Sequence, residues 1–287
     1  MAIRTLFLTI LFLILILPLA QAFQLRGMDN PESFIVDPTT GIFYVSNVAG
    51  SPTAKDNNAF IAKIDASGKL LDRHFIRSGK NGVTLNAPKG LAISGGNLYV
   101  TDIDTVRRFD KHSGKLLGTI DLALLGAKFL KDIALGPASH LFVSDTAGNV
   151  IFKIDPAKNY QVTILVKGPG LGNPNGLVYE TPQNRLLVAT GASGKIISVD
   201  MQGNILTIFQ GAFKGLDGID LDRQGNMIVS SFTAGEIYRI KKYSTVEVLR
   251  KHMATPADIS FDPRNNQVLV PSFDGNLVFT FSPDQRN

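Results

Sequence analysis

Short apolar stretches alternate with turn-forming residues from Phe23 to the end of the chain, and six of these stretches repeat one pattern. Each copy holds a polar residue, a short apolar strand, a turn rich in Gly, Pro, Asn or Asp, and a second strand that ends in small polar residues. The copies are NPESFIVDPTTGIFYVSN from Asn30, APKGLAISGGNLYVTD from Ala87, FLKDIALGPASHLFVSD from Phe129, NPNGLVYETPQNRLLVAT from Asn173, GLDGIDLDRQGNMIVSS from Gly215 and TPADISFDPRNNQVLVPS from Thr255. Third and fourth strands, such as NVIFKID and YQVTILV, follow most copies.

The spacing of the copies predicts the fold. A repeat of roughly 40–45 residues with four strands is typical of a β-propeller blade. Six units therefore predict an all-β, six-bladed β-propeller with four antiparallel strands per blade. The first interval is longer because residues 47–60 form an enlarged connection. The sixth unit lacks an outer strand, and the spare strand Phe23–Met28 is expected to complete it and close the ring.

The first residues predict export rather than structure. One basic residue, Arg4, precedes an apolar run from Thr5 to Leu17, and Ala20–Ala22 ends it with small residues. This is the pattern of a secretory signal peptide over residues 1–22, which leaves a propeller domain over residues 23–287. An uncleaved anchor is the alternative, but the run is short for a membrane span. We expect a periplasmic or secreted protein without stable membrane association after cleavage.

Composition narrows the classes of partner. The chain has no Cys, which excludes disulfides and lipidation at the cleavage site. Its 29 basic and 24 acidic residues are spread along the sequence, without basic clusters interleaved with aromatic residues. Nucleic-acid binding is therefore not expected. We expect a monomer that acts on a small molecule.

One polar residue stands just before the inner strand of each predicted blade, and these six residues should face one another around the channel mouth. The aligned set is Glu32, Lys89, Asp132, Asn175, Asp217 and Asp258. Four carboxylates, one amide and one ammonium give this ring a formal charge of −3. A hard cation with oxygen ligands would relieve the repulsion. The alternative is a hydrated polar channel without a metal, and Asp258 in particular could simply cap its own turn.

Three of these motifs resemble a known family. NPES at Asn30, PNGL at Pro174 and LDGIDLD at Leu216 are similar to motifs of the senescence marker protein/gluconolactonase (regucalcin) family, and the similarity spans the chain after the signal. The resemblance implies a divalent metal held by Glu32, Asn175 and Asp217. Ca²⁺ is the first expectation, with Mg²⁺, Mn²⁺ or Zn²⁺ as alternatives. The resemblance also implies lactone hydrolysis in which a carboxylate, usually the aspartate ligand, accepts the proton of the attacking water.

The motif before the third inner strand departs from the family pattern. Sugar-lactone members carry Arg-x-Asn-Asp there, whereas this chain has FLKD, so Phe129 and Lys131 stand in place of the Arg and Asn. This favours a more apolar lactone or ester as substrate. Asp217 is the candidate catalytic base, with Asp132 as a second candidate, and Lys89, Lys131 and Asp258 are expected at the substrate rim. The alternative function is a non-catalytic propeller of the NHL type that binds a protein or glycan.

Overall fold

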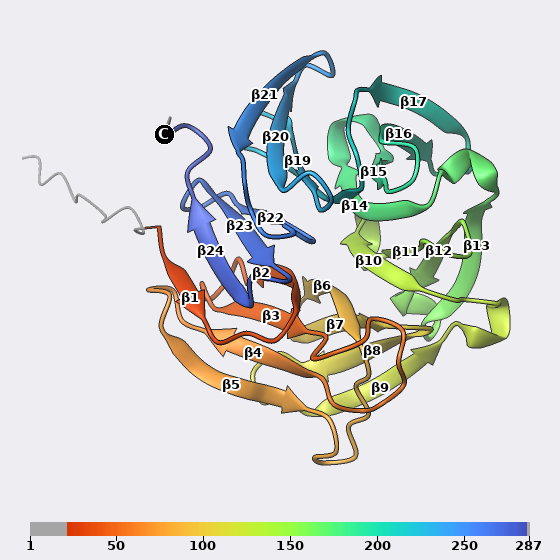
Figure 1. Cartoon of the computed structure of the whole chain (residues 1–287). Helices are drawn as coiled ribbons and strands as arrows, with labels where there is room; N and C mark the ends of the chain where they lie inside the picture. Colours follow the sequence, from red (N-terminus) through yellow and green to blue (C-terminus); the bar gives the residue numbers. More distant parts are fainter. Residues whose placement is uncertain (1–21, 286–287) are drawn as a thin grey trace, which may run out of the picture.

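The computed structural model describes residues 22–285 as six four-stranded antiparallel sheets arranged around a central axis (Figure 1). This confirms the predicted six-bladed propeller. Within blades one to five the strand order follows the sequence, so each blade is a meander from the channel outwards. Residues 1–21, and with them nearly all of the predicted signal peptide, lie outside the described residues.

The first three blades occupy residues 31–167. Blade one contains β2 (Pro31–Val36), β3 (Phe43–Asn47), β4 (Phe60–Ile64) and β5 (Leu70–Arg77). Blade two contains β6 (Pro88–Ser94), β7 (Asn97–Asp102), β8 (Thr105–Asp110) and β9 (Leu116–Asp121). Blade three contains β10 (Leu130–Leu135), β11 (Leu141–Asp145), β12 (Val150–Asp155) and β13 (Gln161–Lys167).

The other three blades complete the circle. Blade four contains β14 (Pro174–Glu180), β15 (Arg185–Thr190), β16 (Lys195–Asp200) and β17 (Ile205–Gln210). Blade five contains β18 (Leu216–Leu221), β19 (Met227–Ser231), β20 (Glu236–Lys241) and β21 (Thr245–Arg250). Blade six contains β22 (Ser260–Asp262), β23 (Gln267–Ser272), β24 (Leu277–Phe281) and the N-terminal β1 (Gln24–Arg26).

The hydrophobic core lies between neighbouring blades. Second strands such as β3 and β11 are buried along their whole length because a blade packs on each face. Between blades two and three, for example, Tyr99 and Val106 pack with Leu141 and Phe152. Outer strands such as β13 are only partly buried. The core thus holds six sheets at fixed angles and leaves their inner edges to line the channel.

Ring closure follows the prediction. Strand β1 pairs with β24, with Leu25 opposite Val278. At the inner edge, the backbone N–H of Asp258 donates to the carbonyl of Glu32 at 2.9 Å, so blade six is also joined to blade one beside the channel. The first and last of the described strands, β1 and β24, therefore close the circle together.

Helical structure within residues 22–285 is limited to single turns. The five 3₁₀ turns in the described residues are η1 (Ala123–Leu125), η2 (Pro137–Ser139), η3 (Pro156–Lys158), η4 (Pro169–Leu171) and η5 (Thr181–Gln183). Among residues 22–285 no helix has the length and apolar character needed to cross a membrane.

Candidate active site at the channel mouth

A β-bulge near the start of each inner strand of blades one to five positions the candidate site. In β14 the pairing shifts between Pro174 and Leu177, so that Asn175 and Gly176 together face a single residue of β15. The same shift occurs in β2, β6, β10 and β18. Such a bulge bends the strand and re-aims its side chains.

The second residue of the bulge is glycine in three blades because neighbouring inner strands approach too closely for a side chain. A Cβ on Gly176 would lie 2.4 Å from the carbonyl oxygen of Asp217 in the next blade. A Cβ on Gly218 would lie 2.3 Å from the backbone nitrogen of Ile259. The Asn-Gly and Asp-Gly pairs in the sequence therefore reflect close packing between blades.

A repeated hydrogen bond identifies the equivalent first residue of each bulge. Hydroxyls on the second strands donate to the carbonyl of the first bulge residue in the following blade. The pairs are Ser46 with Lys89, Thr101 with Lys131, Ser144 with Asn175 and Ser230 with Ala257, each at 2.7 Å. The bulges of β2 and β18 identify Glu32 and Asp217 as the equivalent residues in blades one and five. The six structurally equivalent ring residues are therefore Glu32, Lys89, Lys131, Asn175, Asp217 and Ala257.

The ring predicted from the sequence is thus wrong by one residue in blades three and six. Asp132 and Asp258 occupy the second bulge position, where other blades have glycine or Ser33. Lys131 and Ala257 take the ring positions instead. The ring contains two carboxylates and two ammonium groups, so its formal charge is zero rather than −3.

Five of the six ring residues, all except Ala257, line the same pocket as three phenylalanine side chains. The pocket has a volume of about 280 Å³. Its lining residues are Glu32, Pro52, Lys89, Phe129, Lys131, Asn175, Gly191, Gly215, Leu216, Asp217, Phe232, Thr233 and Phe273. The rings of Phe232 and Phe273 meet edge to face, with centroids 5.8 Å apart. The pocket therefore combines an apolar wall with a few charged groups, as small-molecule sites commonly do.

The charged groups of this pocket form one buried ion-pair cluster. The ammonium group of Lys131 donates to Glu32 Oε1, and the same Nζ lies 3.3 Å from Asp217 Oδ1. All three side chains are buried. Blades one, three and five thus meet through a single cation, because the narrow mouth brings alternate blades within reach of one lysine.

Three oxygen atoms of the pocket are buried without a hydrogen-bond partner. They are Glu32 Oε2, Asn175 Oδ1 and Asp217 Oδ1, the last of which is close to Lys131 but without hydrogen-bond geometry. The Asn175 amide is oriented by its Nδ2, which donates to the carbonyl of Leu216 at 3.1 Å. Each residue predicted to hold a metal therefore presents one unpaired oxygen. Such atoms are rare in folded proteins and indicate a site for a ligand or ion.

Lys89 lies in the same pocket but makes no ion pair among the described residues. Its Nζ donates to the carbonyl of Ala87 at 3.0 Å and lies 4.4 Å from the centroid of the Phe129 ring. Burial lowers the pKa of Lys89 to about 8, an effect that the charge of Asp102 partly offsets. Lys131 is therefore the lysine that contacts the carboxylates, and Lys89 adds a second positive charge to the pocket without an ion pair.

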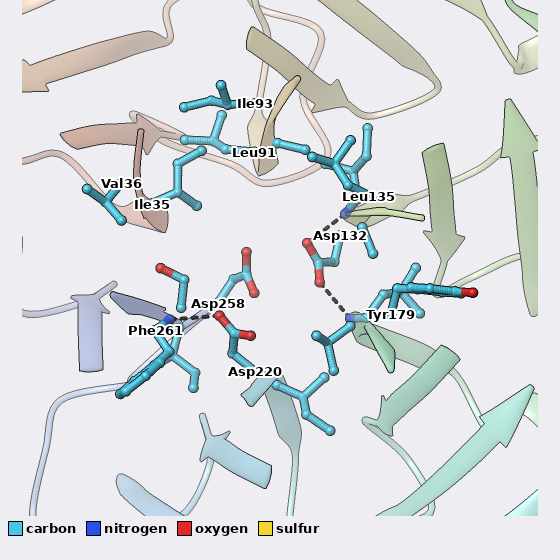
Figure 2. Close-up of a pocket in the computed structure, with 18 of the residues that line it drawn as sticks. Ile35, Val36, Leu91, Ile93, Asp132, Leu135, Tyr179, Asp220, Asp258 and Phe261 are labelled. Atoms are coloured by element: carbon cyan, nitrogen blue, oxygen red, sulfur yellow. Dashed lines mark hydrogen bonds between the residues drawn. The ribbon is translucent and has the colours of Figure 1, made fainter. Parts of the chain in front are cut away.

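A second cavity, of about 330 Å³, contains the two misaligned aspartates and lies farther along the inner strands (Figure 2). Asp132 accepts hydrogen bonds from the backbone N–H groups of Ile133 and Leu177, both at 2.6 Å. Asp220 accepts from Leu221 and Phe261, both at 2.7 Å. These carboxyl groups tie neighbouring inner strands together among apolar side chains.

Burial raises the pKa of all three carboxyl groups in this cavity. The pKa of Asp132 is raised to about 7 and that of Asp220 to about 6, although their backbone hydrogen bonds act in the opposite direction. The pKa of Asp258 is raised well above its usual value by burial and then by the charge of Asp132. The cavity thus favours neutral carboxyl groups.

The structure separates the two predicted catalytic residues. Asp217 lines the mouth pocket, whereas Asp132 lines the second cavity, with both oxygens engaged by the backbone. Of the predicted rim residues, Lys89 and Lys131 line the mouth pocket and Asp258 does not. His252, which lies in the connection before blade six, lines a third cavity beside β21.

The predicted metal ligands are together, but a lysine is among them. Within residues 22–285 no group of three or more His, Asp or Glu side chains is arranged to hold a metal ion, and the mouth pocket offers two carboxylates and one amide. Their unpaired oxygens suit a hard cation. With Lys131 in its observed position, however, a positive charge already contacts both carboxylates, and the set does not fit a divalent ion.

Sequence reasoning missed the central role of Lys131 and the aromatic wall. Phe232 and Phe273 both line the pocket, and each directly follows the small polar end of a second strand, in SSF and PSF. This repeated Ser-Phe pair was the signal that could have identified them.

No protein-family model and no curated protein matches the chain. Solved structures match it over most of its length. Virginiamycin B lyase from Staphylococcus aureus has a TM-score of 0.65 at 16% identity, covering 91% of this chain and 98% of that one. A protein of unknown function from Bacteroides thetaiotaomicron has a TM-score of 0.70 at 13% identity, covering 92% and 72%. A streptogramin B lyase has a TM-score of 0.65 at 13% identity, covering 91% and 96%. At these identities the similarity establishes the propeller fold alone.

Proposed function

We propose that this protein is a hydrolase that acts on a small apolar lactone or ester in the mouth pocket. The observation that carries the proposal is the buried cluster of Glu32, Lys131 and Asp217 in a pocket walled by phenylalanine rings. Burying three charged side chains is costly for stability, and such clusters in pockets are commonly functional. That solved propellers of similar fold are named as lyases is consistent with an enzyme.

The pocket contains the groups that ester hydrolysis needs. A carbonyl oxygen placed near the ammonium group of Lys131 would be polarised, because positive charge stabilises the oxyanion that forms. Asp217 Oδ1 lacks a hydrogen-bond partner and can accept the proton of a water that attacks the carbonyl carbon. The C–O bond of the ester then breaks, and the proton passes from Asp217 to the departing oxygen. The rings of Phe129, Phe232 and Phe273 would hold an apolar acyl or alcohol group.

The resemblance to the regucalcin group favours the same reaction class. That family uses a divalent metal, but with Lys131 in contact with Glu32 and 3.3 Å from Asp217 the residues here do not fit one, and no step is assigned to a metal. In this proposal the ammonium group of Lys131, which lies between Glu32 and Asp217, polarises the carbonyl instead.

Hydrolysis of a panel of aryl esters and of γ- and δ-lactones with alkyl or phenyl substituents tests the proposal. Each substrate is assayed in the presence of EDTA and, separately, with added Ca²⁺, Mg²⁺, Mn²⁺ or Zn²⁺. Asp217→Asn should lower kcat/KM by about 100-fold or more while the fold is retained. Asp274→Asn is the matched control, because Asp274 is exposed next to Phe273 but does not line the pocket. Absence of turnover for every substrate, or equal activity of Asp217→Asn, would refute the proposal and favour the non-catalytic binding propeller.

A further inference from the structure

We propose that the ammonium group of Lys131 takes the place of a divalent metal ion in this propeller, so that the native mouth pocket is a metal-independent site with a tethered cation. The metal-binding part of this inference is independent of the proposed hydrolase activity. Its catalytic part, in which Lys131 polarises the substrate carbonyl, rests on that activity.

The position of Lys131 carries the inference. Its Nζ contacts Glu32 Oε1 and lies 3.3 Å from Asp217 Oδ1, so one nitrogen lies between two of the three predicted metal ligands. A cation-binding position between two carboxylates is the location that a metal ion would need. The side chain of Lys131 reaches it from blade three, and its backbone is fixed by the hydrogen bond from Thr101 to its carbonyl.

The charge balance supports replacement rather than coexistence. Glu32 and Asp217 contribute two negative charges, and Lys131 and Lys89, which line the same pocket, contribute two positive charges. A divalent ion added to this neutral set would lie within a few ångströms of an ammonium group in a poorly hydrated site, where like charges repel strongly. Metal binding would therefore require Lys131 to leave both carboxylates.

The sequence of the third blade agrees with this arrangement. In the family that the chain resembles, an asparagine stands where this chain has Lys131, within the run Arg-x-Asn-Asp. A neutral amide leaves the space between the carboxylates open to a metal, whereas the longer lysine side chain fills it with its own charge. Phe129, in place of the arginine, lies beneath Lys89 in a cation–π contact and does not compete for the carboxylates.

Calorimetric titration of the full-length protein with Ca²⁺, Mg²⁺ and Mn²⁺ tests the inference. The native protein should bind none of them at about 1 mM. Lys131→Asn and Lys131→Met should bind at least one of them at least about tenfold more tightly than the native protein, because the competing charge is gone. Lys89→Met is the matched control. It removes the same charge from the same pocket but leaves the Lys131 contacts intact, so its affinity for the metal ions should increase far less.

Each outcome decides the question. Binding of a divalent ion by the native protein with a Kd below about 100 μM would overturn the inference, as would equal gains in Lys131→Met and Lys89→Met. If the Lys131 variants fold only when metal is added, detected by circular dichroism, the metal has replaced the missing cation and the inference holds. If no metal restores them, it fails. Native turnover that persists in EDTA supports the catalytic part, and turnover that EDTA abolishes refutes it, whereas absence of all turnover refutes only the proposed hydrolase.

Discussion

The ammonium group of Lys131 on blade three contacts the carboxylate of Glu32 on blade one, and blade two lies between them in the ring. The contact crosses the channel mouth rather than following its circumference. The carboxylate of Asp217, on blade five, lies 3.3 Å from the same nitrogen. One lysine thereby connects three alternate blades at the inner edge of the propeller. The cluster is a structural element as well as a candidate catalytic centre.

Replacing Lys131 with methionine should strongly destabilise the metal-free protein. Glu32 and Asp217 would remain buried as two unpaired carboxylates, and loss of one partner from a buried ion pair typically costs about 3–5 kcal/mol. Urea unfolding at neutral pH, followed by circular dichroism, measures the difference. Glu32→Gln combined with Lys131→Met should recover part of the loss, because one of the unpaired charges is then absent. A loss below about 1 kcal/mol for the single variant would contradict the buried ion pair.

Replacing Lys89 with methionine should have the opposite effect at neutral pH. Lys89 is buried without a carboxylate partner among the described residues, and its folded-state pKa of about 8 lies below the usual 10.5. Methionine retains the packing and removes the cost of burying the charge, which that shift places at up to about 3 kcal/mol.

The pH dependence of this effect has a definite sign. Between pH 8 and pH 10.5 the unfolded chain holds the Lys89 proton more tightly than the folded protein, so native stability rises with pH in that interval. The advantage of Lys89→Met should therefore be largest below pH 8 and disappear near pH 10.5. Unfolding free energies of both proteins at about pH 7.5 and about pH 10 test this, and a less stable variant at the lower pH would refute it.

The number of blades, their four strands and the closing strand could all be predicted, because repeat length and turn residues are local properties of the sequence. The register of the ring could not be derived from polar residues alone. Aligning Asp132 and Asp258 with Asn175 placed them one residue away from their true equivalents, Lys131 and Ala257. The column that contains Gly90, Gly176 and Gly218 marks the register in three blades, since a side chain there would meet the backbone of the next blade. Blades one, three and six have Ser33, Asp132 and Asp258 in this column, so the glycine signal is missing from them.

The ion pair between Lys131 and Glu32 could not be predicted from the sequence for a different reason. Lys131 and Glu32 are 99 residues apart, and their contact depends on the width of the mouth and the reach of a lysine side chain. Repeat analysis identifies which residues share a ring, but not which of them meet across it. The same holds for the unpaired oxygens of Glu32, Asn175 and Asp217, which only the three-dimensional arrangement shows.

Truncating Phe23 should weaken the closure of the ring. Its ring packs against Phe34 and Phe43, with centroid distances of 6.2 and 5.5 Å, and its carbonyl accepts from the backbone of Thr280 at 2.9 Å. Because the side chain is only partly buried, Phe23→Ala should cost about 2 kcal/mol of unfolding free energy, less than a fully buried phenylalanine.

The neighbouring Gln24→Ala is the control for this experiment, since Gln24 is exposed at the start of β1 and its replacement should change stability by less than about 0.5 kcal/mol. Thermal unfolding of both variants in parallel provides the comparison. Equal stabilities would mean that β1 contributes little to holding blade six in place.

Asp220 should make the protein more stable as the pH falls towards 5. Its pKa is raised by burial from 3.8 to about 6, and Asp132 and Asp258, which line the same cavity, are shifted in the same direction. A raised folded-state pKa means that the folded protein binds the proton more tightly than the unfolded chain. The resulting stabilisation is fully present below about pH 4 and is lost as the pH rises through the folded-state values near 6 and 7.

The variant Asp220→Asn isolates this contribution. Asparagine does not titrate, so the change in unfolding free energy between about pH 4 and about pH 7 should be smaller than in the native protein by roughly 3 kcal/mol. The slope is the readout, because the substitution also removes one of the two oxygen acceptors that bind Leu221 and Phe261 and so lowers stability at every pH. Asp274→Asn, on the exposed surface, should leave the slope unchanged. Identical slopes for the native protein and Asp220→Asn would show that Asp220 titrates normally and that water reaches it freely through the channel.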